Sequence, residues 1–171
     1  MNPLVGLDIP EGIDTLDFSR VLFLDFDGVL HPEVGMPDRH FCCLPDFSEV
    51  LRAVDPGLRL PIVISSMWRI FYPLQTMRER FPPDIAARIV GVTPSSFLEQ
   101  MQSAPGGTLV AGERPDDQHR EGEVRAWMRA HAPGGQWLAV DDREGYFAPG
   151  CPHLFAEIGR ASCRERVSLN V

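Results

Sequence analysis

The chain has 171 residues, of which 44% are hydrophobic and 23% charged, as in a one-domain globular protein rather than a disordered chain. Its net charge of −8 argues against non-specific binding to nucleic acid, which depends on cationic contacts to phosphate, but leaves room for a local basic pocket. No apolar run is long enough to span a membrane, and the acidic amino terminus lacks signal-peptide features, so we expect a cytoplasmic protein.

Short apolar runs alternate with helical patterns after an irregular leader over residues 1–19. The expected strands, buried on both faces of a sheet, cover 21–25, 58–65, 87–93, 136–142 and, more weakly, 153–156. The expected helices between them cover 47–54, 68–81 (with a kink at Pro73) and 120–131, while residues 94–118 are mostly loop. This alternation predicts an α/β fold in which a doubly wound, Rossmann-like parallel sheet lies between helices.

Two carboxylates, Asp25 and Asp27, follow the first predicted strand two residues apart, just before a turn at Gly28. Both can approach one ligand, because side chains at this spacing share a face. Asp25 could attack a phosphoryl group, while Asp27 could protonate the leaving oxygen and then deprotonate water. A bare Asp-x-Asp is also common at turns, so the pattern needs further support. His31, in the loop that follows, is expected to be held by backbone groups rather than to face a substrate.

Further polar residues follow the other predicted strands, at the edge where ligands bind in open parallel sheets. They are Ser65 and Ser66 after the second strand, Asp141 and Asp142 after the fourth, and Arg120 at the start of the last helix. Clustered carboxylates repel one another, so we expect a hard dication such as Mg²⁺ to hold them together. A serine hydroxyl and a guanidinium offer phosphate contacts, although the serines could equally end the strand or cap a helix.

The segments VLFLDFDGVL, PIVISS and WLAVDD resemble, in this order, motifs I, II and IV of the haloacid dehalogenase (HAD) superfamily. The likeness covers residues 20–156, and SSMWR and DDRE resemble more specifically the compact HAD domains of RNA-repair multidomain proteins. The resemblance implies a Rossmann-like HAD fold and Mg²⁺-dependent hydrolysis of a phosphomonoester through an aspartyl-phosphate. The implied substrate is a phosphorylated small molecule or a nucleic-acid end. The short separation of motifs I and II implies a flap and no large cap domain.

The resemblance also implies roles for the four aspartates. Asp25 is expected as the nucleophile and a ligand of Mg²⁺. Asp27 is expected as the general acid and base, with its backbone carbonyl on the metal. Asp141 and Asp142 resemble the metal ligands of motif IV, one direct and the other through water.

Phosphate binding is implied for motifs II and III. Ser66 is the expected phosphate-binding residue of motif II, with Ser65 as the alternative. The family usually has lysine in motif III, but this chain contains none. Arg120 is the expected substitute and Arg69 the alternative, with a planar group whose geometry differs from that of lysine.

The carboxyl end of the chain departs from this pattern. Back-translated, residues 157–167 match one reading frame of a widely used sequencing adapter, so we expect residues 157–171 to be a non-native tail on a truncated domain. A natural arginine-rich tail is the alternative.

Two other functions stay open, because a fold does not guarantee an activity. One is a non-catalytic module that binds phosphate or a nucleic-acid end in a repair system; the other is an inactive fragment.

Overall fold

A five-stranded sheet forms the centre of the computed structural model, which describes residues 6–9, 15–33, 39–95 and 119–156. All neighbouring strands are parallel, in the order β3-β2-β1-β4-β5. The strands are β1 (Arg20–Leu24), β2 (Ile62–Ile64), β3 (Ile89–Val92), β4 (Gln136–Val140) and β5 (Leu154–Phe155). The predicted parallel α/β sheet is therefore confirmed.

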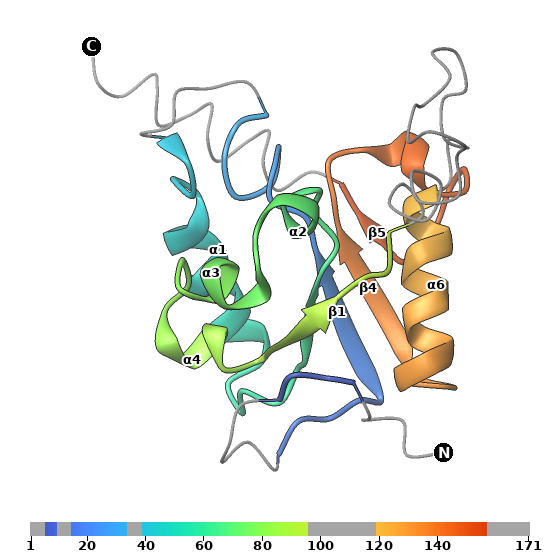
Figure 1. Ribbon diagram of the computed structural model, residues 1–171, viewed down its shortest axis with the longest axis horizontal. Helices are drawn as coiled ribbons and strands as arrows, with labels where there is room; N and C mark the ends of the chain where they lie inside the picture. The colour runs from blue at the N-terminus through green and yellow to red at the C-terminus, as the bar shows by residue number, and fades with distance from the viewer. Residues whose placement is uncertain (1–5, 10–14, 34–38, 96–118, 157–171) are drawn as a thin grey trace, which may run out of the picture.

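Helices cover both faces of the sheet. They are α1 (Leu44–Val54), α2 (Trp68–Phe71), α3 (Leu74–Arg78), α4 (Pro83–Ala86) and α6 (His119–His131), together with the 3-10 turn η3 (Glu144–Tyr146). Figure 1 shows α1, α3 and α4 on one side of the sheet and α6 on the other. Within the described ranges, no helix combines the length and the apolar character needed to cross a membrane.

The core consists of two apolar clusters, one on each face of β1. Leu22 and Leu24 face the cluster on the side of α1, whereas Val21 and Phe23 face the cluster that includes α6. The ring of Phe23 meets Trp127 edge-on, with 5.5 Å between centroids. Because both faces of β1 are covered, its side chains from Val21 to Leu24 are apolar without alternation, which is why the sequence shows a continuous apolar run.

Two helices differ from the sequence prediction. The helix expected over 68–81 is divided into α2 and α3, because Tyr72 is extended and Pro73 stands as the N-cap of α3. Proline disfavours the helical conformation in the residue before it, so the chain breaks here rather than kinking. The first helix begins at Leu44, before the expected start, since Pro45 is tolerated in a first turn. Residues 96–118, most of the segment expected as loop, and the tail at 157–171 lie outside the described residues.

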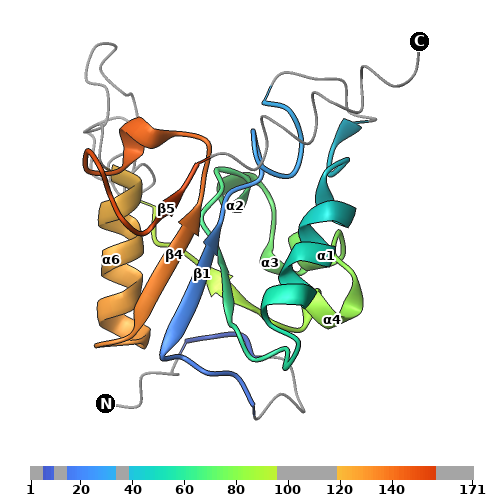
Figure 2. The ribbon, with the colours of Figure 1, turned by 180° about the vertical axis from the view of Figure 1, so that it is seen from behind.

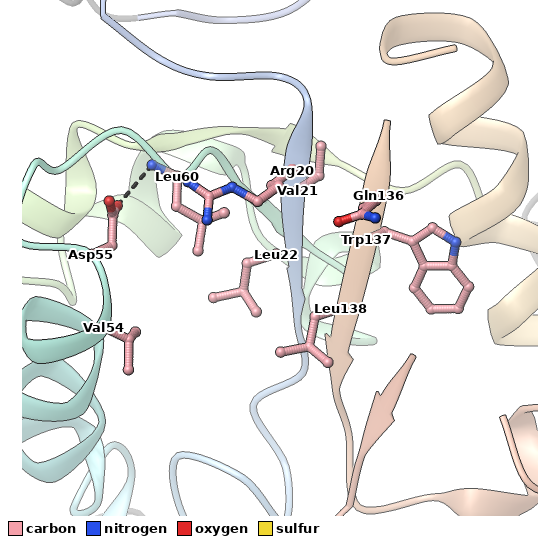
Figure 3. A pocket seen from close by; sticks show the side chains of 9 residues that line it. All are labelled: Arg20, Val21, Leu22, Val54, Asp55, Leu60, Gln136, Trp137 and Leu138. Carbon is pink, nitrogen blue, oxygen red and sulfur yellow. Dashed lines mark hydrogen bonds between the residues drawn. The ribbon is translucent and has the colours of Figure 1, made fainter. Parts of the chain in front are cut away.

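A cavity of about 260 Å³ opens at the amino ends of β1 and β4, beside the end of α1 (Figure 3). It is lined by Arg20, Val21, Leu22, Val54, Asp55, Leu60, Gln136, Trp137 and Leu138. The carboxylates of motifs I and IV follow the carboxyl ends of the same two strands, at the opposite edge of the sheet. Because ligands of open parallel sheets bind beyond the carboxyl ends, we place the functional site there and not in this cavity.

Candidate active site

The carboxyl ends of β1 and β4 bring motifs I and IV together. Leu24 of β1 lies opposite Val140 of β4, so Asp25 and Asp141 leave adjacent strands at the same level. Figure 2 shows the arrowheads of these two strands side by side at one edge of the sheet. The strand order also reverses here, since the chain builds outwards from β1 to β3 and then continues at β4. Such a switch point is the usual ligand site of an open α/β sheet.

Three carboxylates meet at this edge. One ligand oxygen from each of Asp25, Asp141 and Asp142 lies within 4.8 Å of the others. Asp25 and Asp141 are buried, and Asp142 is half-buried. Burial and the nearby charge of Asp25 raise the pKa of Asp141 to about 7, although Arg120 acts in the opposite direction. An all-oxygen donor set with this much repulsion fits a hard divalent cation such as Mg²⁺.

Gly28 makes room for the third carboxylate. Its φ is +77°, in the left-handed region that glycine adopts readily. A Cβ built at this position would lie 2.2 Å from Cγ of Asp142. The turn after Asp27 therefore needs glycine for two reasons: its backbone conformation, and the close approach of Asp142 to the cluster.

Arg120, at the start of α6, lies against the carboxylate cluster. Its buried guanidinium places Nη1 3.0 Å from Oδ2 of Asp141 and 3.6 Å from Oδ1 of Asp25. Burial alone would lower the pKa of Arg120, but the charges of Asp25, Asp141 and Glu123 outweigh it and raise the pKa. The structure thus places this arginine beside the expected nucleophile, where the motif III lysine of the family would be expected to act.

Arg69 is engaged elsewhere. Its Nη1 donates to the backbone carbonyl oxygens of Ser65 at 2.5 Å and Ser66 at 2.7 Å, and its Nη2 donates to Glu123 at 2.6 Å. Burial lowers the pKa of Arg69, and the positive charge of Arg120 acts in the same direction, whereas Glu123 opposes both. Its hydrogen bonds therefore tie the loop after β2 to α6, and Arg120 is the arginine beside the carboxylates.

Ser65 and Ser66 are both buried at the end of β2. The backbone N–H of Ser65 donates to the carbonyl of Leu24 at 2.9 Å, which keeps this turn level with the end of β1. Oγ of Ser66 accepts a hydrogen bond from the N–H of Trp68 at 3.4 Å. Ser66 lies just before α2, whose N-cap is Met67 and has no side-chain capping hydrogen bond. A hydroxyl that accepts one hydrogen bond still has its own proton to donate to a phosphate oxygen.

The Asp27 carboxylate is not part of the three-carboxylate cluster and is held by two side chains. Its Oδ1 accepts hydrogen bonds from Nε2 of His31 at 3.0 Å and from Nε1 of Trp68 at 3.3 Å. The His31 hydrogen bond is the main cause of a lowered pKa of Asp27, and the Trp68 hydrogen bond acts in the same direction against partial burial. His31 was expected to be held by backbone groups, but it is buried and bound to this carboxylate. A histidine four residues after Asp27 was the available signal.

Aromatic rings pack around Trp68, the residue whose indole N–H donates to Asp27. The ring of Trp68 contacts those of His40, Phe41 and Tyr72, with centroid separations of 5.3, 5.4 and 5.1 Å. Phe41 has a φ of 61°, an uncommon backbone conformation for a bulky residue, and its ring packs tightly in this group. Phe41 and Trp68 are partly buried and pack against the apolar cluster on the side of α1.

Comparison with known proteins agrees with this geometry. The family model described as "HAD domain in Swiss Army Knife RNA repair proteins" matches residues 21–156. No curated protein and no solved structure gives a significant match. The matched range contains every site residue described above, from Asp25 to Asp142. The chain therefore belongs to the family of HAD domains found in Swiss Army Knife RNA repair proteins.

Proposed function

We propose that this protein hydrolyses phosphomonoesters with the help of Mg²⁺, through an aspartyl-phosphate formed on Asp25. The observation that carries the proposal is the buried contact between Arg120 and both Asp25 and Asp141 at the carboxyl edge of the sheet. This contact supports the proposal because one positive group and the acidic metal-ligand candidates lie around Asp25, the proposed nucleophile. Membership of a HAD family supports the hydrolase class.

The acidic cluster fits the metal that this class of enzyme uses. Asp25, Asp141 and Asp142 would hold Mg²⁺ through carboxylate oxygens, and the resemblance implies the backbone carbonyl of Asp27 as a further ligand. When bound, the ion would supply positive charge that offsets both the repulsion among the carboxylates and the charge on the phosphate oxygens.

In the first half of the reaction, an oxygen of the Asp25 carboxylate attacks the phosphorus atom. The bond from phosphorus to the leaving oxygen breaks, its electron pair stays on that oxygen, and Asp27 donates the proton that converts it to an alcohol. Arg120 stabilises the charge on the phosphate oxygens, and the Ser66 hydroxyl is the proposed further donor to them.

In the second half, Asp27 accepts a proton from a water molecule whose oxygen attacks the phosphorus. The bond between phosphorus and Asp25 breaks, which restores the Asp25 carboxylate and releases inorganic phosphate. Asp27 regains the proton it lost in the first half. The hydrogen bond from His31 favours the carboxylate form of Asp27, which is the form that accepts this proton.

The proposed substrate is a phosphorylated molecule or nucleic-acid end. The description of the family as a domain of RNA repair proteins supports a nucleic-acid end. The described part of the connection between β1 and β2 holds a single helix, α1, which leaves the site more accessible than a separate cap domain would.

Residues 157–171 remain proposed as a non-native tail. Sequencing the genomic locus across codon 157 tests this, and natural coding sequence there would contradict it.

Release of phosphate from an aryl phosphate tests the proposed function. We expect release that requires Mg²⁺, is abolished by EDTA and is lost in Asp25→Asn, while the variant keeps a native-like near-UV circular dichroism spectrum. Release that persists in Asp25→Asn would refute the proposed nucleophile. Binding of inorganic phosphate without hydrolysis of any ester would instead favour the non-catalytic module.

A further inference from the structure

Glu123 is a buried acid that stands behind Arg120, outside the three-carboxylate cluster. It lies on α6 three residues after Arg120, and its side chain is only 3% exposed. Glutamate is almost never this buried unless it is paired, because removing its charge from water is costly. The partners of Glu123 therefore indicate why it is there.

Glu123 pairs closely with Arg69 and more distantly with Arg120, two arginines of the site. Its Oε2 lies 2.6 Å from Nη2 of Arg69 and 4.0 Å from Nε of Arg120. The other terminal nitrogen of Arg69, Nη1, donates hydrogen bonds to the backbone carbonyl oxygens of Ser65 and Ser66. One carboxylate oxygen thus faces both the loop after β2 and the guanidinium that contacts the expected nucleophile.

The charges around the site explain what this oxygen does. The guanidinium of Arg120 is attracted towards the metal-site carboxylates by Asp25 and Asp141, and away from them by Glu123. Arg120 already donates to Asp141 at 3.0 Å; without the attraction of Glu123, the guanidinium would also close the 3.6 Å gap to Asp25 and compete with a cation for that oxygen. Glu123 also separates two buried guanidinium charges that would otherwise repel each other. With all its carboxylates ionised, as metal binding would require, the full set has two negative charges in excess, the charge of one divalent cation; its members are Asp25, Asp141, Asp142, Glu123, Arg69 and Arg120.

We propose that Glu123 is a positioning residue, which holds the guanidinium of Arg120 in place for the phosphoryl group and anchors Arg69 behind it. The inference rests on the proposed function, because the phosphoryl group is the proposed ligand of Arg120. Glu123 touches neither the substrate nor the metal in this account. Its effect on the reaction passes through Arg120.

Glu121 provides a matched control on the same helix. It is also buried, and it pairs with an arginine, Arg125, with 2.5 Å between Oε1 and Nη2. Its Oε2 accepts a hydrogen bond from the N–H of Ala148 at 2.6 Å, on the side of η3. Glu121→Gln therefore removes a buried, paired charge from α6 without touching either arginine of the site.

The test compares Glu123→Gln and Glu121→Gln with the wild type, at the same Mg²⁺ concentration. We expect Glu123→Gln to lower kcat by about 10- to 100-fold and to change KM by less than about threefold, because a misplaced group costs rate in the reacting complex. The rise in Tm on adding Mg²⁺ should also shrink, since the excess negative charge falls. Glu121→Gln should lower the metal-free Tm and leave kcat and the Mg²⁺-dependent rise unchanged.

Three results would overturn the proposal. They are a kcat within about threefold of wild type in folded Glu123→Gln, an equal loss of kcat in Glu121→Gln, and a Mg²⁺-dependent rise in Tm that is unchanged in Glu123→Gln.

Should Glu123→Gln fail to fold, Glu123→Asp keeps the charge but withdraws it by one methylene. In that folded variant, kcat more than about threefold below wild type supports the proposal, and a smaller loss overturns it. If the wild type binds Mg²⁺ but hydrolyses nothing, the proposed function fails, and the rises in Tm alone decide the role of Glu123.

Discussion

Replacing Gly28 by alanine is expected to damage the metal site more than the fold. The added Cβ would lie 2.2 Å from Cγ and Oδ2 of Asp142, and real Cβ atoms essentially never approach within 3.0 Å of another heavy atom. The Asp142 carboxylate must therefore move by roughly 1.2–1.8 Å to reach ordinary contact. That movement takes it away from Asp25 and Asp141, the other two members of the cluster.

The backbone cost of the same substitution can be measured separately. A non-glycine residue in the left-handed region costs about 1–2 kcal/mol, and Gly28 has a φ of +77°. Gly150 has a φ of +70° and nothing within 4 Å of a built Cβ, so Gly150→Ala carries the backbone cost without the collision. At about 2–4 °C per kcal/mol, both variants should lose roughly 2–8 °C in metal-free Tm.

Thermal unfolding with and without Mg²⁺ is the assay. A ligand at 100 times its Kd stabilises the folded state by about 2.7 kcal/mol, which corresponds to a rise in Tm of roughly 5–10 °C. Wild type and Gly150→Ala should both show this rise, and Gly28→Ala should lose most of it together with phosphate release. An equal Mg²⁺-dependent rise in the two alanine variants would refute the placement of Asp142 in the metal site.

Three further substitutions probe separate parts of the structure. In the first turnover, before the intermediate is hydrolysed, Asp27→Asn should slow alcohol release from an alkyl phosphate by about 10²- to 10⁴-fold, but much less from an aryl phosphate whose leaving group needs no proton; equal losses in that turnover would contradict its role as an acid. Asp142→Asn should abolish the Mg²⁺-dependent rise in Tm without lowering the metal-free Tm, and an intact rise would contradict its role as a ligand. Phe23→Ala, which removes a ring buried against Trp127, should cost about 3–5 kcal/mol of unfolding free energy in urea; a loss below 1 kcal/mol would contradict the described packing.

The sheet and its active edge were predictable from local patterns. The apolar run that ends at Asp25 indicates a strand covered on both faces, and the structure places Val21 and Leu22 in different clusters on opposite faces. Parallel pairing then brings the ends of such strands to one edge. For this reason, the sequence could anticipate that Asp25 and Asp141 lie close together before any contact was known.

Contacts between distant side chains were not predictable in the same way. Glu123 and Arg69 are 54 positions apart, and their pairing depends on how α6 packs beside the loop after β2. Helical spacing places Glu123 near Arg120, but it does not indicate that both are buried. His31 was missed for a similar reason, because its spacing of four residues from Asp27 does not by itself indicate that the turn between them brings its ring onto the Asp27 carboxylate.

Chemical trapping of the intermediate tests the central claim most directly. Asp27→Asn incubated with Mg²⁺ and an aryl phosphate should accumulate the aspartyl-phosphate, because formation needs no acid with this leaving group while water attack loses its base. Borohydride reduces an acyl phosphate to an alcohol, so peptide mass spectrometry should find a reduced side chain at Asp25. Phosphate release by the wild type with no reduction at Asp25, or with reduction at another residue, would contradict the account.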